Sequence, residues 1–238
     1  MQTAASNDTP ANNFTAARLN KDLPNRSSLG VMFVNREGTG SLAGPDNYNR
    51  TFSVDGKLGI RQAVSISAFA ARTQTRGKEG RDYAYSSSFD FRTRAYEAAF
   101  AYTEVGDNFN PEVGFLERPD GYRQINSTFR RHLRTPGLAR FGLRELEPHA
   151  SYASYWGFDG LQETATLHLD VRWDFENSSG FNSTALNVQY EGLREPFQIY
   201  PGVVVPAGHY RSPYFLGSAQ TDPRKWIKIG RASCRERV

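Results

Sequence analysis

TATLHLDVRWDFE, residues 164–176, alternates apolar and polar side chains without a break. At about 100° per residue, a helix would scatter the apolar side chains around its whole circumference, so the period of two predicts a β-strand. A strand of about eleven or twelve residues spans roughly 36–40 Å, whereas strands of ordinary soluble sheets have about five or six residues. The apolar positions are Ala165, Leu167, Leu169, Val171, Trp173 and Phe175.

The other face of this strand carries five ionisable side chains in a row. They are His168, Asp170, Arg172, Asp174 and Glu176. Tilted at about 45°, such a strand covers a height of about 25–28 Å, which matches the apolar band of a bacterial outer-membrane barrel. The pattern therefore predicts a membrane strand, with its apolar face toward lipid and these five side chains facing a hydrated lumen.

The same alternation recurs along the chain, and no window shows helical apolar spacing. About eleven strands are expected, at residues 14–21, 28–35, 50–60, 62–72, 82–91, 96–103, 122–133, 143–156, 164–176, 186–190 and 210–219. Short turns and longer polar loops alternate between them, as periplasmic turns and extracellular loops do. The sequence predicts an all-β fold, an antiparallel up-and-down outer-membrane-type β-barrel that is incomplete, with the partial barrel domain at residues 14–228.

Both ends of the chain depart from this pattern. Residues 1–13 are polar and predict disorder or an inter-strand loop; they lack the basic and apolar regions of a secretion signal. Residues 229–238, IGRASCRERV, resemble a translated sequencing adapter and are interpreted as a non-native tail. We therefore expect a fragment cut at both ends, an open curved sheet whose unpaired edges cause aggregation.

Composition narrows the functional classes. No run of 18 apolar residues occurs among the 238, so the sequence predicts no transmembrane helix. The formal charge of +4 is small and dispersed, without a basic stripe, which argues against nucleic-acid binding. The single cysteine, Cys234, lies in the adapter-like tail, so no disulfide framework is expected.

No motif in the sequence predicts catalysis, a cofactor or a metal site. The histidines are His132, His149, His168 and His209, and none has HExxH or paired spacing, so they are interpreted as surface or lumen residues. Asp170 and Asp174 lie about 13 Å apart along one strand, which is too far for a glycosidase pair unless a neighbouring strand supplies the partner. A hydrated lumen face is the favoured interpretation of these carboxylates.

Residues 106–119 are expected to form a long loop, which is a candidate constriction of the barrel lumen. Its polar candidates are Asp107, Asn108, Asn110 and Arg118, around the apolar Phe109, Val113 and Phe115. Two interpretations stay open: an Ω-loop packed on its own aromatics, or a constriction loop folded inward. The Pro-rich stretch 200–210 is expected to be an ordered loop outside the wall, because proline cannot donate to a sheet ladder.

Several long segments resemble one bacterial family. These are GDNFNPEVGF (106–115) with Arg118, EGLREPFQIYPGVVVPAGHYR (191–211), NFTAARLNKDLPNRSSLGVMFVNRE (13–37) and NYNRTFSVDG (47–56). They resemble domain-of-unknown-function family 5916, commonly found C-terminal to a carbohydrate-binding family 9-like domain. The resemblance covers nearly everything before residue 229, and it implies an outer-membrane-type barrel with no catalytic residues to carry over.

Three functional hypotheses follow. The first is a fragment of an outer-membrane β-barrel of a Gram-negative type bacterium, in contact with outer-membrane lipid, which passes or binds a carbohydrate or other small solute. The second is a carbohydrate-active, glycoside hydrolase-like enzyme module. The third is a soluble all-β binding module.

Overall fold

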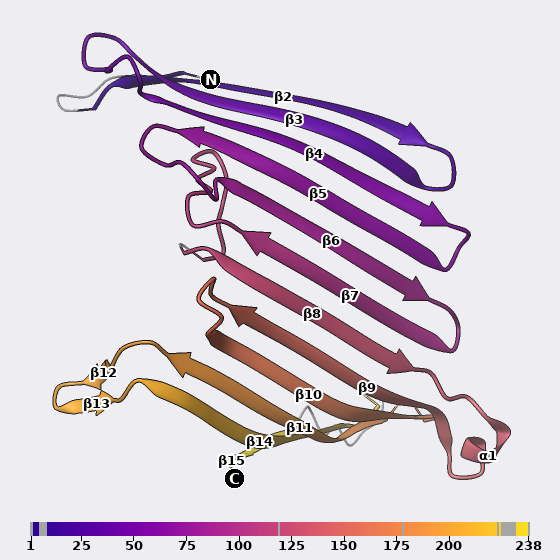
Figure 1. Cartoon of the computed structure of the whole chain (residues 1–238). Coiled ribbons are helices and arrows are strands. Elements are labelled where there is room, and N and C mark those ends of the chain that lie inside the picture. Colours follow the sequence, from indigo (N-terminus) through magenta and orange to yellow (C-terminus); the bar gives the residue numbers. More distant parts are fainter. Residues whose placement is uncertain are drawn as a thin grey trace. The chain divides into compact units, whose positions relative to one another are not determined.

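The computed structural model describes residues 2–4, 9–118, 120–177, 179–222, 224 and 232–237, and most of them lie in β-strands (Figure 1). In the hydrogen-bonded order, each strand follows its predecessor in the chain, from β1 through β11 and then to β14 and β15. The hairpin β12–β13 forms a separate two-stranded sheet. The expected fold class is thus confirmed: the chain is all-β, antiparallel and up-and-down, in a sheet that does not close.

The strands of this order are long. Their bounds are β1 Gln2–Thr3, β2 Ala11–Leu23, β3 Ser27–Thr39, β4 Tyr48–Ile60, β5 Val64–Thr75, β6 Tyr83–Arg92, β7 Tyr96–Val105, β8 Tyr122–Arg131, β9 Leu143–Trp156, β10 Gln162–Phe175, β11 Gly180–Leu193, β14 Gly208–Gln220 and β15 Ala232–Arg237. The small hairpin consists of β12 Phe197–Tyr200 and β13 Val203–Val205, and a single helical turn, α1, covers Pro136–Ala139. Within the described residues, no helix combines the length and apolarity needed to cross a membrane.

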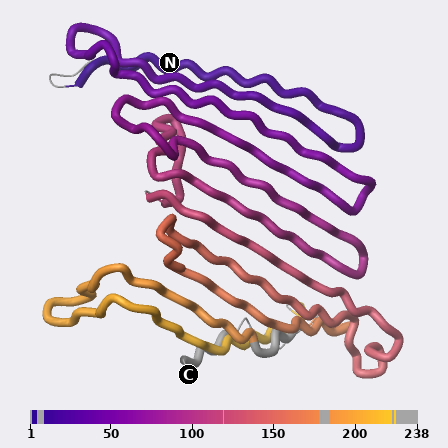
Figure 2. Tube along the Cα trace, in the orientation of Figure 1, coloured from indigo at the N-terminus to yellow at the C-terminus, as the bar shows by residue number. Residues whose placement is uncertain are grey.

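The chain forms two compact units, and the first contains residues 1–89 and 101–123. In this unit β2 to β5 form a meander with short turns at 24–26 and 61–63 and longer loops at 40–47 and 76–82 (Figure 2). Asn25 and Arg26 have φ angles of 61° and 59°. Positive φ at both central residues defines a type I′ turn, whose twist matches that of the flanking strands.

The β2–β3 turn lies close to the end of β4. The backbone N–H of Gly59 donates to Ser27 Oγ at 3.0 Å. A Cβ at Gly59 would lie only 2.1 Å from the backbone oxygen of Asn25. Glycine is therefore required here by close approach of two backbones rather than by its own dihedral angles.

Burial in this first unit is inverted relative to a globular sheet. On β4, the polar Asn49 and Thr51 are 1% and 7% exposed, whereas Phe52 and Val54 are each 45% exposed. The register extends this division across β2 to β5, because Leu19, Val31, Val54 and Ala70 lie side by side. The first unit therefore has an exposed apolar face and a sheltered polar face, the reverse of the usual arrangement.

The second unit contains residues 90–100 and 124–238. Here β10 pairs with β9 on one side and β11 on the other. Strand β10 corresponds to the expected strand 164–176. It begins two residues earlier, at Gln162, and ends at Phe175. Glu176 thus lies in the following turn, where its N–H donates to the oxygen of Gly142 at 2.9 Å.

Two expectations for loops in the second unit need correction. The Pro-rich stretch lies outside the main sheet as expected, but it is not only a loop: β12 and β13 form a separate hairpin there, since strand pairing can use the residues between the prolines. The alternation of short turns and long loops also fails, because β8 and β9 are joined by a long segment that contains α1, while the turn between β9 and β10 is short. Both differences occur in segments whose sequence does not alternate between apolar and polar residues, so the sequence does not predict their backbone conformation.

The chain ends are more regular than expected over their described residues. Gln2–Thr3 pairs with β2, which begins at Ala11, so part of the predicted polar segment 1–13 is strand. Residues 232–237 of the predicted non-native tail pair with β14 as β15. Residues 229–231 and 238 lie outside the described part of the chain, and the non-native origin of the tail stays a prediction.

Candidate functional site

The polar face of β10 meets a second row of polar side chains on β9. Antiparallel register places the partners directly opposite one another, because side chains at paired positions point to the same face. The pairs are His168 with Ser151, Asp170 with His149, Arg172 with Glu147, and Asp174 with Glu145. Four of the five predicted lumen-facing residues are thus brought into one row, and Glu176 is not.

The centre of this row is a group of two histidines and a carboxylate. His149 Nδ1 lies 2.9 Å from Asp170 Oδ1, and His168 Nε2 lies 3.5 Å from Asp170 Oδ2. The two imidazole rings are 5.4 Å apart at their centroids. On β11, Asn187 Oδ1 lies 2.7 Å from His168 Nδ1. All four side chains are mostly buried, with Asp170 only 10% exposed.

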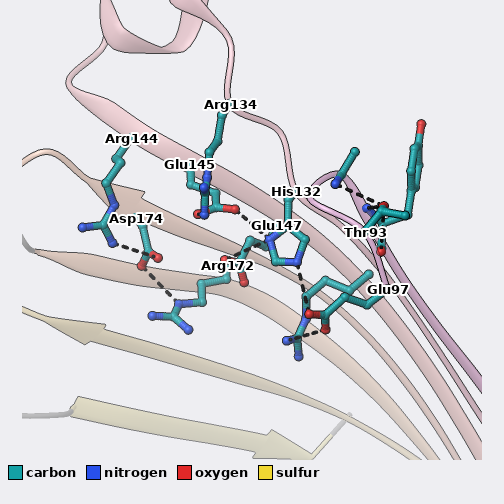
Figure 3. A network of polar contacts seen from close by, with 12 residues as sticks. Thr93, Glu97, His132, Arg134, Arg144, Glu145, Glu147, Arg172 and Asp174 are labelled. Atoms are coloured by element: carbon teal, nitrogen blue, oxygen red, sulfur yellow. Dashed lines mark hydrogen bonds and ion pairs between the residues drawn. The ribbon is translucent and has the colours of Figure 1, made fainter. Parts of the chain in front are cut away.

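Next along the row, two arginines hold Asp174 (Figure 3). Arg172 Nε lies 3.1 Å from one carboxylate oxygen and Arg144 lies 3.4 Å from the other. Asp174 is buried, while both arginines are about half exposed. The neighbouring strand also places Glu145 opposite Asp174. A second carboxylate therefore does lie beside Asp174, but arginines contact both.

A second cluster forms around His132, just after β8 (Figure 3). His132 Nδ1 lies 2.7 Å from Glu145 Oε1, and the other oxygen of Glu145 lies 2.7 Å from Arg134. Glu147 and Glu97 each approach the ring at 3.6 Å. This arrangement balances the buried charge of Glu145 with two cations or donors, as buried carboxylates require.

The loop after β7 lies on the polar face of the first unit. The backbone N–H of Asn110 donates to Thr73 Oγ1 at 3.0 Å, and Asn49 Nδ2 donates to the backbone oxygen of Asn110 at 2.6 Å. Arg36 forms an ion pair with Glu112. These anchors belong to β3, β4 and β5, so the loop folds back over the sheet.

Two other polar candidates, Asp107 and Asn108, join the loop after β7 to the loop 76–82. Asp107 forms an ion pair with Arg81 at 2.8 Å, and Asn108 Nδ2 donates to the backbone oxygens of residues 79 and 80. Arg118 is half-buried. Of the three apolar side chains, Phe109 is buried, whereas Val113 and Phe115 are exposed. Polar contacts with the sheet, rather than a shared aromatic core, hold the loop.

A buried acidic group also occurs on the apolar side, at the ends of β6 and β7. Glu104 accepts hydrogen bonds from Tyr83 at 2.8 Å, Tyr102 at 2.7 Å and Arg123 at 3.1 Å. The carboxylate side chain is 7% exposed. Tyrosines whose rings face apolar surroundings and whose hydroxyls face a polar group are typical of interfacial positions.

The turn between β9 and β10 is joined to the segment after β11 by one arginine. Arg194 contacts both carboxylate oxygens of Asp159, at 2.9 and 3.1 Å, and reaches Glu163 at 2.6 Å. Hydrogen bonds from Arg194 and from the Leu161 N–H hold the pKa of the Asp159 carboxyl below its usual range. The contact fixes the orientation of the turn that sets the β9–β10 register.

Sequence reasoning missed several of these residues. The missed set is Glu97, Glu104, Arg134, Glu145, Glu147 and Asn187 as site members, with His132 and His149 assigned only as surface or lumen histidines. A signal for His149 existed: a hairpin centred on residues 157–160 places it opposite His168 or, with a slightly shifted centre, opposite Asp170. Glu104 carries no such signal, because its partners come from three strands.

No protein-family model, curated protein or solved structure matches the chain.

Proposed function

We propose that this chain is part of a bacterial outer-membrane β-barrel. In this proposal the apolar face of each unit contacts lipid, and the polar face lines a hydrated passage. The solute is a small polar molecule, and the resemblance to family 5916, with its usual carbohydrate-binding neighbour domain, favours a carbohydrate. No catalytic step is assigned to the chain.

The inverted burial of β4 is the observation that carries this proposal. Phe52, Val54, Leu58 and Ile60 are each 45–51% exposed, yet Asn49 and Thr51 on the opposite face are buried. In water such a face would cost roughly 25 cal/mol for each Å² of apolar surface left exposed. Large contiguous apolar surfaces mark contact with a membrane or another protein. Long strands favour the membrane.

Strand length supports the same interpretation. Strands β2 to β11 have 10 to 14 residues each. A tilted strand needs about 9–11 residues to cross the hydrocarbon core of a bilayer. Tyr83 and Tyr102, close to the loop ends of their strands, would then lie at the height of an aromatic girdle.

The polar faces support a hydrated passage rather than a dry core. Carboxylates, amides, hydroxyls and imidazoles line them, and the loop 106–118 covers part of one. Interior faces of outer-membrane barrels are polar for the same reason, because water and solute occupy the lumen. The arginine contacts of Asp174 and Glu145 fit charge balance in such a lumen.

Flotation with lipid vesicles tests the membrane assignment. The full chain is refolded in detergent, mixed with vesicles of phosphatidylethanolamine and phosphatidylglycerol, and centrifuged through a density gradient after detergent removal. We expect the folded chain to float with the lipid and to migrate differently on gels with and without heating. A folded monomer that stays in the aqueous fraction would instead favour the soluble binding module.

Solute release tests the passage. Vesicles loaded with radiolabelled glucose and with high-molecular-weight dextran are prepared with and without the inserted chain. Because the sheet of one chain does not close, insertion requires its open edges to pair with those of further copies in the bilayer, and we expect glucose to leave vesicles with such inserted protein faster than dextran does. Retention of both by vesicles that carry heat-modifiable, inserted protein would contradict a passage role and leave only the membrane location.

A further inference from the structure

We propose that His149, His168 and Asp170 form a binding site for a divalent transition metal ion of the Zn²⁺ class. The three residues lie on the polar face of β9 and β10. One ligand atom from each, the imidazole nitrogens and a carboxylate oxygen, lies within 4.8 Å of the others. The inference does not depend on the membrane location or on a passage.

The distances suit a tetrahedral ion. Zinc binds imidazole nitrogen and carboxylate oxygen at about 2.0–2.2 Å, so two ligand atoms of a tetrahedral site lie about 3.3 Å apart. His149 Nδ1 lies 2.9 Å from Asp170 Oδ1 and His168 Nε2 lies 3.5 Å from Asp170 Oδ2, so each imidazole faces its own oxygen of the carboxylate at a separation close to that value. Binding of one ion by all three side chains requires the two imidazole nitrogens and a carboxylate oxygen, which lie within 4.8 Å of one another, to converge on it by rotation of the side chains.

Asn187 fixes which nitrogen of His168 is available. Its Nδ2 donates to the backbone oxygen of Ala185 at 3.2 Å, so its Oδ1 points to His168 and accepts from Nδ1 at 2.7 Å. His168 therefore carries a hydrogen on Nδ1. In the neutral ring, Nε2 then presents a lone pair toward Asp170.

This orientation brings two acceptors together. A lone pair on His168 Nε2 and a carboxylate oxygen of Asp170 at 3.5 Å repel one another unless a cation lies between them. That cation is either a proton on Nε2 or a metal ion bound by both atoms. A second-shell amide or carbonyl that orients a histidine in this way is typical of metal sites.

The backbone also favours a site at Asp170. The register between β10 and β11 shifts between Leu169 and Val171, so Asp170 lies at an irregularity of the ladder. Such bulges re-aim side chains and occur often beside functional sites. Three protein ligands leave the fourth position of a tetrahedral ion open to water or solute.

The second group with suitable ligand atoms is a poorer site. His132, Glu145 and Glu147 meet the same distance criterion. However, Arg134 lies 2.7 Å from Glu145, so a fixed cation already compensates that carboxylate. A metal ion there would be repelled by the guanidinium. His132 therefore serves as the matched control for the proposed ligands.

Titration of the full chain, refolded in detergent with Cys234→Ser to remove the only thiol, tests the site. Zn²⁺ binding is followed by calorimetry, and Co²⁺ by its visible absorption, which is intense for four-coordinate ions. We expect one ion per chain, loss of that binding in His149→Ala, His168→Ala and Asp170→Asn, and unchanged binding in His132→Ala and His209→Ala. Asn187→Ala should weaken affinity about 10- to 100-fold, as expected for loss of an orienting partner.

The outcomes separate a metal site from a proton-bridged pair. Absence of stoichiometric binding by the folded chain would overturn the proposal, as would loss of binding in His132→Ala but not in His149→Ala. If a ligand variant misfolds by circular dichroism, the near-isosteric Asp170→Asn and the Asn187→Ala affinity decide in its place. Unchanged affinity in both of these variants would contradict the assigned ligands.

Discussion

Asn110 and Thr73 are 37 residues apart, yet the backbone N–H of Asn110 donates to Thr73 Oγ1 at 3.0 Å. Thr73 belongs to β5 and is only 1% exposed. The contact joins the loop after β7 to the polar face of the first unit. It identifies the loop as one anchored by hydrogen bonds to the sheet, the position that a constriction loop requires.

The substitution Thr73→Val removes this acceptor while preserving side-chain shape. A buried N–H left without a partner costs about 1–3 kcal/mol, so we expect lower unfolding free energy and faster hydrogen exchange at Asn110. Thr51→Val is the matched control, because Thr51 is buried beside Thr73 and has no side-chain hydrogen bond within the described residues. Equal exchange at Asn110 in both variants would contradict the anchor.

Gly59 and Gly56 provide a test of backbone approach on one strand. A Cβ at Gly59 would lie 2.1 Å from the Asn25 oxygen, whereas at Gly56 the nearest atom, Leu29 Cδ1, lies at 3.6 Å. We expect Gly59→Ala to destabilise the chain by about 1–3 kcal/mol through overpacking, and Gly56→Ala to be neutral or slightly stabilising. Denaturant unfolding in detergent measures the unfolding free energy of both variants. Equal values would show that the turn at 24–26 moves without cost to accept the added Cβ.

Val54 and Ser53 are neighbours on β4 that point to opposite faces. If the apolar face contacts hydrocarbon, Val54→Arg should cost about 2–4 kcal/mol in lipid, whereas Ser53→Arg on the polar face should cost far less. For a water-exposed face, Val54→Arg would fall within about 0.5 kcal/mol of the parent. Unfolding titrations in lipid vesicles separate the two cases, and similar costs at both positions would contradict lipid contact.

Tyr102 donates to the buried carboxylate of Glu104 at 2.7 Å. The variant Tyr102→Phe removes a hydrogen bond to a charged group, so we expect a loss of about 1.5–3 kcal/mol of unfolding free energy. Tyr96→Phe on the same strand is the control, because the Tyr96 ring packs against Phe129 and Arg131 rather than donating to a carboxylate. Equal losses of unfolding free energy in the two variants would show that the hydrogen bond to Glu104 does not stabilise the fold.

The strands could be predicted from sequence because their pattern is local. In residues 164–176 each apolar side chain is followed by a polar one, and β10 covers all of this stretch except Glu176. The end at Phe175 was missed because the alternation continues into the turn. The β12–β13 hairpin was missed because Pro196, Pro201 and Pro206 mask its short strands.

The sites depend on register and were predicted only in part. His168 and Asp170 share a strand face, so their proximity follows from a period of two. Asn187 comes from β11, and its contact with His168 depends on a register that shifts between Leu169 and Val171. Loop anchors such as Asn49 to Asn110, 61 residues apart, have no periodic signal at all.

Spin-label accessibility along β4 measures the central claim most directly. Single cysteines replace residues 50–58 one at a time in the Cys234→Ser chain, and collision rates with oxygen and with a water-soluble nickel chelate are recorded in lipid vesicles. Labels at Phe52, Val54 and Leu58 should collide mainly with oxygen, and labels at Ser53, Asp55 and Lys57 mainly with nickel. Equal nickel access on both faces, or the reverse alternation, would contradict a lipid-facing apolar surface.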